Sequence, residues 1–235
     1  MNKLYIVMPA YNEQDNIESV VRNWYKVLSF AGDESKLIVA DSGSTDGTHN
    51  ILTRLKSELS KLEIISNSNK FHGPKLIAMY KLALANNAEY VFQTDSDGQT
   101  NPDEFKGFWD LKEDYDVIIG HRVIRGDGYI RKLIEKIVCL ILKIIFNVDV
   151  KDANAPFRLM KANVLSEYID RFDDDYELPN IMLTTYFSFY KHSILYKEIS
   201  FKKRQGGKNS INLCKIMKVG FKAISDFKKF KREMC

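Results

Sequence analysis

The sequence predicts an α/β fold built on a mostly parallel sheet with helices on both of its faces. The first observation behind this prediction is that short apolar runs alternate with helical patterns through the first 120 residues. The second is that these runs are nearly continuous in apolar residues, which is typical of strands that are covered on both faces. Such alternation indicates βαβ units, whose consecutive strands lie parallel.

Five apolar runs in this half are expected to be strands, and a sixth follows near residue 200. They are Leu4–Met8, Leu37–Ala40, Leu62–Ile65, Tyr90–Thr94, Val117–Gly120 and Ile194–Phe201. Helices are expected between them, one over Gln14–Phe30 and the next ending near Leu59. The residues expected to begin the helices are Asn12 for the first, Ser44 or Asp46 for the second, and Pro74 and Pro102 for the two that follow.

Beyond residue 120 the sequence predicts mainly helices. They are expected over Ile130–Phe146, Lys161–Ile169, Pro179–Lys191 and Asn212–Glu233. The last is amphipathic, because apolar residues recur at helical spacing and lysines fill the opposite face. Its apolar stripe consists of Leu213, Ile216, Gly220, Ile224 and Phe227. We therefore divide the chain into a main domain, residues 1–210, and a basic amphipathic C-terminal helix, residues 211–235.

Positive charge is concentrated at the C-terminal end. From Phe201 onward, 11 Lys or Arg residues against two acids give a charge of +9, which leaves −5 for the rest of a chain that carries +4. A basic segment on an acidic body indicates an anionic partner. The amphipathic stripe favours a membrane surface over nucleic acid, because no nucleic-acid-binding motif is recognised. The competing interpretation is that the stripe packs on the main domain.

Several classes of protein are not expected. The three cysteines lie far apart with no CxxC, which argues against a disulfide framework and a zinc site. No run reaches the about 20 apolar residues of a membrane-spanning helix. The run Leu4–Met8 is too short for a signal peptide. We therefore expect a cytoplasmic protein, peripheral on the cytoplasmic face of the membrane.

Polar residues follow four of the expected strands. They form the segments Pro9–Glu13, Asp41–Thr48, Asp95–Gln99 and His121–Arg122. Because ligands of an open parallel sheet bind at the carboxyl ends of its strands, these segments are expected to meet at one ligand site.

Asp95 and Asp97 are the most specific feature of this edge. Carboxylates two positions apart in an extended segment project to one side and can hold a hard divalent cation against a pyrophosphate. The same spacing recurs at Asp114–Asp116 and Asp173–Asp175, and the place of Asp95 and Asp97 directly after an apolar run selects them. Spacing alone leaves a solvated turn or a helix-capping acid as an alternative.

The segment after the second strand is rich in small residues. Asp41 is placed to accept a hydrogen bond from a nucleobase, while helix capping is an equal account of Ser44 and Asp46. A G-x-x-x-x-G-K-[ST] phosphate loop is absent. Arginines pair with phosphate oxygens in a fork geometry, and for each one alone a surface salt bridge is the alternative. The candidates are Arg122, Arg131, Arg158 and Arg204.

Six short motifs occur in a fixed order. They are Pro-Ala-Tyr-Asn-Glu, Asp-x-Gly-Ser-Thr-Asp-Gly-Thr, Asp-x-Asp-Gly-Gln, Gly-His-Arg, Asp-x-x-x-Pro-Phe-Arg and Arg-x-x-Gly-Lys. Together they resemble the family 2 glycosyltransferases of GT-A fold, and look closest to the polyprenyl-phosphate, dolichyl-phosphate mannosyltransferase-like branch. The resemblance covers roughly Leu4 to Ser210. It implies an inverting enzyme that transfers a sugar from a UDP- or GDP-sugar to a lipid-linked acceptor with Mg²⁺ or Mn²⁺.

The resemblance also implies roles for individual residues. The nucleotide-sugar pocket would be formed by Pro9, Tyr11, Glu13, Asp41, Lys75, Asp95 and Ser96. The metal ligands would be Asp95, Asp97 and Gln99. The phosphates of donor and acceptor would face Arg131, Arg204 and Lys208. The catalytic residues would be Asp97, Arg122 and Asp152, the last as the acid on the acceptor side.

Three features depart from the pattern of this branch. Ser42 stands where a second acid usually follows Asp41, and Glu135 stands four residues after Arg131, where a serine is common. The hydrophobic C-terminal hairpin of some relatives is missing. The acceptor is therefore open between a polyprenyl phosphate and a lipid-linked saccharide. A hydroxyl nucleophile would need a base, whereas an ionised phosphate hardly would.

Two other functions compete with this interpretation. A nucleotidyltransferase that makes nucleotide sugars usually carries a basic glycine-rich loop after its first strand, where residues 10–13 of this chain are Ala-Tyr-Asn-Glu. A non-catalytic module that binds a membrane or nucleic acid would account for the basic C-terminal end. We expect no nucleic-acid partner.

Overall fold

The computed structural model describes residues 2–66, 69–126, 128–204 and 213–234. Within them the strands are β1 (Leu4–Ala10), β2 (Lys36–Asp41), β3 (Leu62–Ile65), β4 (Tyr90–Gln93), β5 (Val117–Arg125), β6 (Arg158–Lys161) and β7 (Ile194–Phe201). The helices are α1 (Ile17–Val27), η1 (Leu28–Phe30), α2 (Thr48–Glu58), α3 (His72–Ala85), η2 (Pro102–Phe105), α4 (Lys106–Trp109), α5 (Tyr129–Phe146), α6 (Ala162–Ile169), α7 (Pro179–Phe189) and α8 (Leu213–Met234). Every strand expected from the sequence is present.

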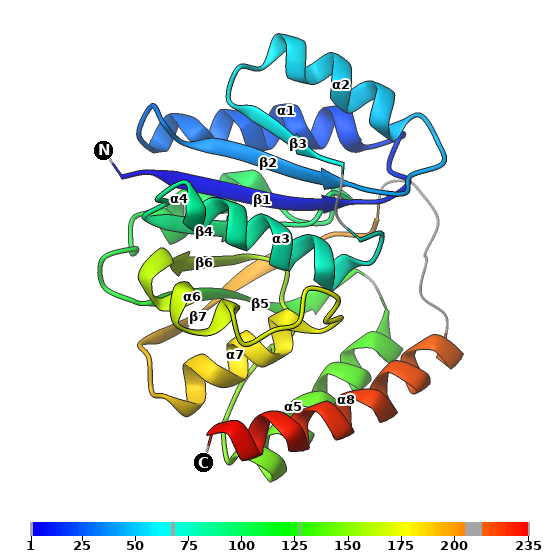
Figure 1. Ribbon diagram of the computed structural model, residues 1–235, viewed down its shortest axis with the longest axis vertical. Helices are drawn as coiled ribbons and strands as arrows, with labels where there is room; N and C mark the ends of the chain where they lie inside the picture. The colour runs from blue at the N-terminus through cyan, green and yellow to red at the C-terminus, as the bar shows by residue number, and fades with distance from the viewer. Residues whose placement is uncertain (1, 67–68, 127, 205–212, 235) are drawn as a thin grey trace.

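The strands form one sheet in the order β3-β2-β1-β4-β6-β5-β7 (Figure 1). β1 pairs in parallel with β2 and β4, β2 with β3, and β5 with β7. Among these strands only β6 runs against its neighbours, β4 and β5. The mostly parallel α/β sheet predicted from the sequence is therefore confirmed.

Side chains of the strands alternate between two hydrophobic cores, one on each face of the sheet. Tyr5 and Val7 of β1 join the core that α3, α5, α6, α7 and α8 cover, whereas Leu4 and Ile6 join the core that α1, α2 and α4 cover. In Figure 1, α3, α6 and α7 lie together over one face. Helices thus cover both faces, as the continuous apolar runs indicate.

The sequence pattern does not predict β6. This strand has only four residues, and charged side chains, Arg158 and Lys161, stand at its two ends. The apolar run between them, Leu159 and Met160, is too short to carry a strand pattern. The strand forms because the fold brings it between β4 and β5, both of which offer it a pairing edge. The helix start expected at Lys161 is therefore one residue too early.

Two further expected helix starts are wrong. α3 begins at His72, two residues before Pro74. Asn12 does not cap the first helix: its backbone is left-handed, with a φ of 55°, and α1 begins only at Ile17. Asn12 is instead hydrogen-bonded to the segment after β2, as described below. At α2, Asp46 is the residue that holds the helix start, because its Oδ1 accepts from the backbone N–H of Thr48 at 3.0 Å.

The C-terminal half of α8 packs against the main domain. Phe227 is 2% exposed, and its ring centroid lies 6.2 Å from that of Phe146 on α5. The prediction that Phe227 enters a membrane interface is therefore wrong, because the hydrophobic core already covers it. None of the described helices combines the length and the apolar character that a membrane span requires. The structure does not describe the side chains of Leu213, Ile216 and Gly220, and the separate unit predicted for residues 211–235 stays a prediction.

Candidate active site

The strand order brings three loops to one point of the sheet. β1 lies between β2 and β4: the chain passes from β1 to β2 on one side, and from β3 across to β4 on the other. At such a point the carboxyl ends of neighbouring strands open the crevice in which α/β sheets bind ligands. The arrowheads of β1 and β2 mark this edge in Figure 1. The loops over residues 11–16, 41–47 and 94–101 follow these strand ends.

Reciprocal hydrogen bonds join the loops after β1 and β2. The backbone N–H of Asn12 donates to Oγ of Ser44 at 3.0 Å, and Oδ1 of Asn12 accepts from the backbone N–H of Thr45 at 2.8 Å. The backbone N–H of Glu13 donates to Oγ1 of Thr48 at 2.8 Å. The small residues after β2 therefore do more than cap α2, because they hold the loop after β1 in place.

Asp41 and Tyr11, the residues predicted to line a nucleoside pocket, lie at this edge. One carboxylate oxygen of Asp41 accepts from the hydroxyl of Ser44, and the other lies 3.1 Å from Nδ1 of His49. Asp41 is thereby held in one orientation, and it is almost fully buried. Tyr11 is 41% exposed, so its ring has a free face on which a base can stack. Contact with a nucleoside stays a prediction.

Two buried side chains bind the carboxyl end of β1. Nζ of Lys75 donates to the carbonyl oxygen of Ala10 at 2.6 Å, and Oγ of Ser96 donates to that of Pro9 at 2.8 Å. Nζ of Lys75 also lies 5.4 Å from the ring centroid of Tyr11. Burial lowers the pKa of Lys75 to about 8, although a neighbouring carboxylate opposes the shift. The contacts of Lys75 and Ser96 fix the loop that carries Tyr11, and their binding of a nucleotide sugar stays a prediction.

Asp95 and Asp97 follow β4 at the same edge. His72, the first residue of α3, places its Nε2 3.2 Å from Oδ1 of Asp95. Oδ1 of Asp97 accepts from the backbone N–H of Gln99 at 3.1 Å. Burial raises the pKa of Asp97 to about 6, and the negative charge of Asp95 adds to the shift. His72 is a site residue that the sequence analysis missed, since no motif marks it.

Glu13 and Arg204 form an ion pair that joins the loop after β1 to the segment after β7. Glu13 is 5% exposed. Burial raises the pKa of Glu13 to about 7. The positive charge of Arg204 opposes this shift, and the negative charge of Asp97 adds a smaller contribution to it. Arg204 therefore lies beside the carboxylates at this edge of the sheet, and its phosphate-binding role stays a prediction. Lys208 lies outside the described residues.

The carboxylates at this edge suit a hard divalent cation. Asp95 and Asp97 supply oxygen ligands, and burial disfavours the ionised forms of Asp97 and Glu13, a cost that a nearby cation would relieve. Within the described ranges, no three His, Cys, Asp or Glu side chains lie close enough to hold an ion by themselves. Phosphate and water oxygens would have to complete the coordination. Gln99 donates its side-chain N–H to the carbonyl oxygen of Lys202 at 2.7 Å, and its role as a ligand stays a prediction.

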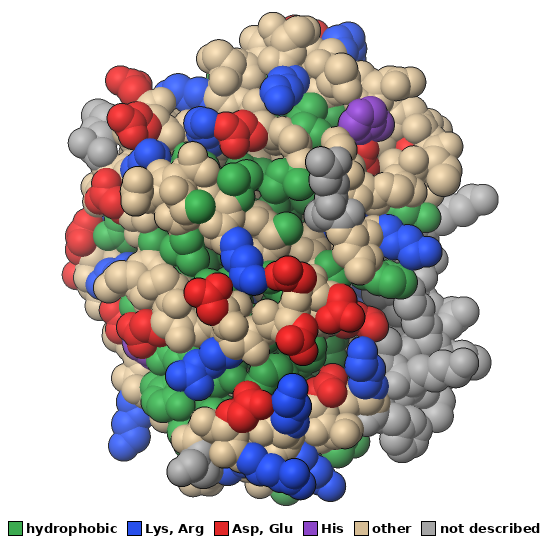
Figure 2. Space-filling view, viewed as in Figure 1, with side chains coloured by type: hydrophobic (Ala, Val, Ile, Leu, Met, Phe, Trp, Pro, Cys, Tyr) green, Lys and Arg blue, Asp and Glu red, His purple; other side chains and the backbone are tan. Residues whose placement is uncertain are grey.

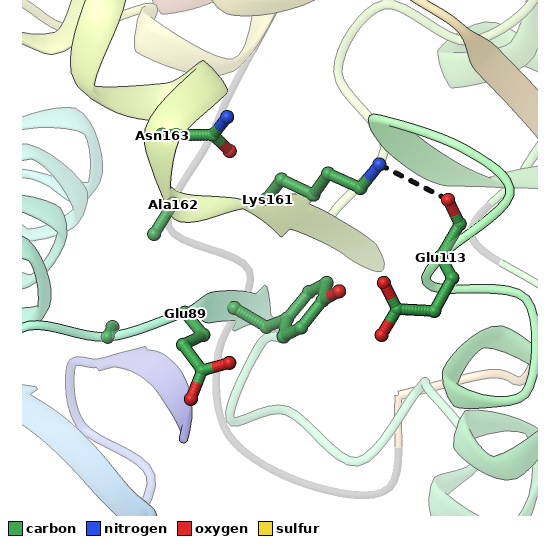
Figure 3. Close-up of a pocket in the computed structure, with 7 residues that line it drawn as sticks. Glu89, Glu113, Lys161, Ala162 and Asn163 are labelled. Carbon is green, nitrogen blue, oxygen red and sulfur yellow. Dashed lines mark hydrogen bonds between the residues drawn. The ribbon is translucent and has the colours of Figure 1, made fainter. Parts of the chain in front are cut away.

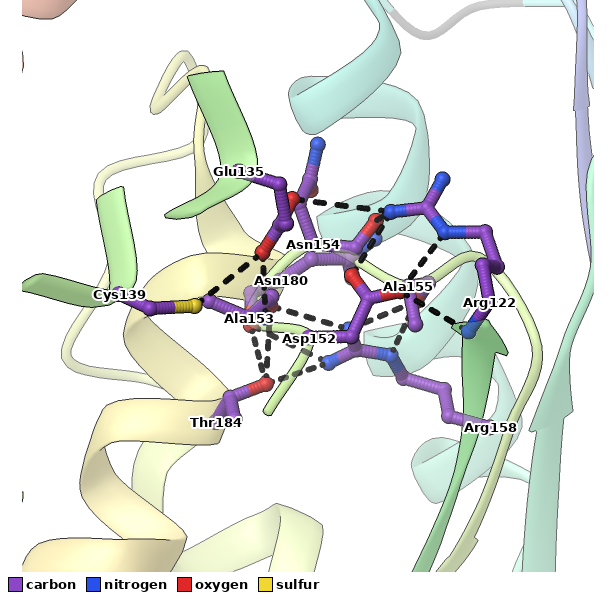
Figure 4. A network of polar contacts seen from close by, with 10 residues as sticks. All are labelled: Arg122, Glu135, Cys139, Asp152, Ala153, Asn154, Ala155, Arg158, Asn180 and Thr184. Carbon is purple, nitrogen blue, oxygen red and sulfur yellow. Dashed lines mark hydrogen bonds and ion pairs between the residues drawn. The ribbon is translucent and has the colours of Figure 1, made fainter. Parts of the chain in front are cut away.

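Arg122 and Asp152 form a second polar cluster, between β5 and the loop before β6 (Figure 4). Nε and Nη2 of Arg122 each donate to a carboxylate oxygen of Asp152 at 2.8 Å. Both residues are buried, 8% and 2% exposed. Such a bidentate pair is geometrically specific and leaves neither carboxylate oxygen without a donor. Their catalytic roles stay predictions, but the geometry gives them a structural role that the sequence does not indicate.

Glu135 of α5 points toward this cluster (Figure 4). Its Oε1 accepts from the backbone N–H of Ala153 at 2.7 Å, and its Oε2 lies 3.7 Å from Arg122. The carboxylate therefore ties α5 to the loop that carries Asp152. Arg131, half-buried one turn earlier on α5, is the residue predicted to face a phosphate, and that role stays a prediction.

Arg158 is the one candidate phosphate ligand that the structure rules out. It is fully buried in β6. Its guanidinium donates to the carbonyl oxygens of Ala155 at 2.7 Å and Asn180 at 3.1 Å, and to the hydroxyl of Thr184 at 3.3 Å. A guanidinium whose donors end on backbone carbonyls and the hydroxyl of Thr184 joins the loop before β6 to α7 and does not reach a ligand.

A separate hollow of about 420 Å³ lies at the opposite edge of the sheet (Figure 3). Its lining includes Tyr90, the first residue of β4, and Lys161, the last residue of the antiparallel β6. Nζ of Lys161 donates to the carbonyl oxygen of Glu113 at 3.3 Å. Because this is the amino end of the parallel strands, the hollow is not the expected ligand site.

Replacing Glu13 by Gln is expected to change how the melting temperature of the metal-free chain depends on pH. The pKa of the Glu13 carboxyl is about 7 in the folded chain and about 4.3 in the unfolded chain. Between these pH values the folded state therefore binds a proton that the unfolded state has released. Its contribution to stability is therefore present at low pH and is lost as the pH rises toward 7. The measurement is the melting temperature of wild type minus that of Glu13→Gln, which should fall from about pH 5 to about pH 7.5.

Asp46→Asn is the control for this experiment. Hydrogen bonds from Thr48 and Gln14 outweigh the effect of burial and lower the pKa of Asp46. The difference in melting temperature between wild type and Asp46→Asn should therefore not change over the same pH range, because the Asp46 carboxyl is ionised in both the folded and the unfolded chain at these pH values. A flat curve for Glu13→Gln as well would contradict the raised pKa.

Comparison with known proteins places the chain in a family. A model described as "Glycosyl transferase family 2" matches residues 5–195. Undecaprenyl-phosphate 4-deoxy-4-formamido-L-arabinose transferase of Pectobacterium carotovorum is 23% identical over 164 residues, 68% of this chain and 49% of that protein. The Proteus mirabilis protein of the same name is 27% identical over 141 residues, 59% of this chain and 42% of that protein. The chain thus spans about half the length of the curated relatives it matches.

Solved structures share the fold. Glucosyl-3-phosphoglycerate synthase from Mycobacterium tuberculosis, in complex with Mn²⁺ and UDP-glucose, superposes with a TM-score of 0.65 at 18% identity, over 95% of this chain and 77% of that one. TarS from S. aureus, in complex with UDP-GlcNAc, gives 0.62 at 18% identity, over 97% and 69%. The match of the family model to most of the chain shows that this protein belongs to glycosyl transferase family 2.

Proposed function

We propose that this family 2 enzyme transfers a sugar from a nucleoside-diphosphate sugar to a lipid-linked acceptor, with inversion at the sugar carbon. The observation that carries the proposal is the position of Asp95 and Asp97 after β4, beside Glu13 and Arg204, at the point where the strand order reverses. This edge offers oxygen ligands for a cation beside a guanidinium, a combination that suits a pyrophosphate. The nucleotide-sugar complexes of similar structures support it.

Asp95 and Asp97 would hold Mg²⁺ or Mn²⁺ when the donor binds. The cation would supply a Lewis acid that neutralises charge developing on the departing nucleoside diphosphate. The chain would contribute the two carboxylates of the loop after β4, of which Asp97 is fixed by the N–H of Gln99. The Mn²⁺ in the structure of glucosyl-3-phosphoglycerate synthase supports a metal of this type.

The acceptor is the less defined substrate, and the names of the sequence relatives point to a polyprenyl phosphate. The geometry of Asp152 supports the same choice. Both of its oxygens accept from Arg122, so it is not poised to take a proton from a hydroxyl. An ionised phosphate needs no such base. A polyprenyl chain would place the reaction at a membrane surface, and we assign the enzyme to its cytoplasmic face.

A donor screen by thermal shift tests the proposal. One nucleotide sugar, UDP- or GDP-linked, is expected to raise the melting temperature by about 5–10 °C at a hundred times its Kd. The shift should be larger with Mn²⁺, and this increase should vanish in Asp97→Asn. Stabilisation by a nucleoside triphosphate together with a sugar phosphate, and by no nucleotide sugar, would instead support a nucleotidyltransferase.

A further inference from the structure

The outer face of α5 is apolar and exposed. Ile130, Leu133, Ile137, Leu140 and Ile144 are between 48% and 74% exposed. Their spacing of three and four residues places them in one stripe along the helix. We call this set the α5 stripe. Scattered exposed apolar residues are ordinary in proteins, but a contiguous row on one helix marks a contact surface.

The α5 stripe is not the core-facing side of the helix. Leu142 and Phe146 are buried in the hydrophobic core, and Glu135 bonds to the backbone of Ala153. At 3.6 residues per turn, Glu135 projects to the side of α5 opposite Leu133 and Ile144. One side of α5 therefore packs in the hydrophobic core, and its other apolar side, the α5 stripe, is directed outward.

The charges beside the α5 stripe suit an anionic surface. Lys132, Lys136 and Lys143 are exposed and lie together along one flank of the stripe. The single acidic residue in the sequence of α5, Glu135, faces inward. α8 lies beside α5 in Figure 1, and exposed Lys and Arg side chains gather at the end of the molecule where α8 finishes in Figure 2. An exposed apolar row with cations beside it and no exposed acid is typical of a helix that lies in a lipid interface.

We propose that α5 lies flat on an anionic lipid bilayer, with the α5 stripe among the headgroups and its lysine flank against anionic lipids. The choice of a lipid bilayer as the partner rests on the proposed function, because a lipid-linked acceptor would be held in a bilayer. Glu135 joins the inner side of α5 to the loop of Asp152. The reactive end of a lipid-linked acceptor at headgroup level would then be about one helix diameter, roughly 10 Å, from the loop that carries Asp152.

Vesicle sedimentation of the full chain, without donor or metal, tests the inference. The wild type is expected to sediment with vesicles of phosphatidylglycerol and phosphatidylcholine, and much less with phosphatidylcholine alone. The double variant Ile137→Ser/Leu140→Ser should bind at least about tenfold more weakly, and Lys136→Gln about fivefold. Phe30→Ser is the matched control, since Phe30 is 43% exposed on η1, outside α5, and should leave binding unchanged.

Unchanged melting temperatures would confirm that the variants fold. Failure of the wild type to bind anionic vesicles at low salt, or equal binding by Ile137→Ser/Leu140→Ser, would overturn the inference. It would also fall if sedimentation equilibrium showed a dimer that the double variant abolishes, because the stripe would then belong to a second copy of the chain. The donor screen needs no vesicles, so a stripe that binds no lipid leaves the proposed sugar transfer standing.

Discussion

Asp97→Asn is expected to reduce sugar transfer by about a hundred- to a thousandfold. The substitution keeps the shape of the side chain and its hydrogen bond with the N–H of Gln99, but it removes one negative ligand for a divalent cation. Because burial already disfavours the charge of Asp97, its replacement should not lower the free energy of unfolding. Initial rates with excess Mn²⁺, and Mn²⁺ affinity measured separately, give the result.

Asp114→Asn is the matched control for this variant. Asp114 and Asp116 repeat the spacing of Asp95 and Asp97, but they precede β5 at the opposite edge of the sheet. Transfer by this control should stay within about twofold of wild type, since surface substitutions away from a site have small effects. Full activity of Asp97→Asn, or of the wild type in excess chelator, would refute the metal assignment.

Asp152→Ala is expected to lower the free energy of unfolding by about 3–5 kcal/mol. The substitution leaves the guanidinium of Arg122, 8% exposed, without the two carboxylate oxygens that it contacts at 2.8 Å. A buried charge that loses its bidentate partner is costly, and Glu135, which is 3.7 Å away, offsets only part of that loss. For a chain of this length the melting temperature should fall by about 10 °C. Denaturant titration and thermal melts measure the change.

Two further variants test whether the loss of stability comes from the ion pair between Arg122 and Asp152. Asp149→Ala removes an exposed carboxylate three residues earlier and should change stability by less than about 0.5 kcal/mol. The double variant Arg122→Met/Asp152→Leu removes both charges and should be more stable than Asp152→Ala. If Asp152→Ala keeps the stability of wild type and loses only activity, the catalytic role predicted from sequence becomes the better account.

The positions of the acidic residues that follow the strands were predictable because strand ends can be read locally. An apolar run such as Tyr90–Thr94 marks a buried strand, and the residues that follow it must lie at an end of the sheet. Asp95 and Asp97 could therefore be placed without knowledge of any long-range contact. His72 could not, because its place beside Asp95 depends on how α3 packs against β1 and β2.

The orientation of the polar side chains in the second cluster, around Arg122 and Asp152, could not be predicted from the sequence either. Arg122 and Arg158 are alike in sequence, because each lies close to an apolar run. One pairs with Asp152, and the other ends on backbone carbonyls beneath α7. Glu135, which stands where a serine is common in the polyprenyl-phosphate branch, turns inward to Ala153. The orientation of each depends on segments that lie far from it along the chain.

By itself the sequence determined the parallel α/β architecture, the edge that carries the site and the family motifs, because hydrophobic period and strand ends are local properties. The tertiary structure alone decided which apolar faces are covered. Two helices have amphipathic stripes, and the core buries Phe227 of α8 while it leaves Ile137 and Ile144 of α5 exposed. An apolar stripe has the same pattern whether protein or lipid covers it, since burial of apolar surface is not directional. Only the packing of distant segments distinguishes the two.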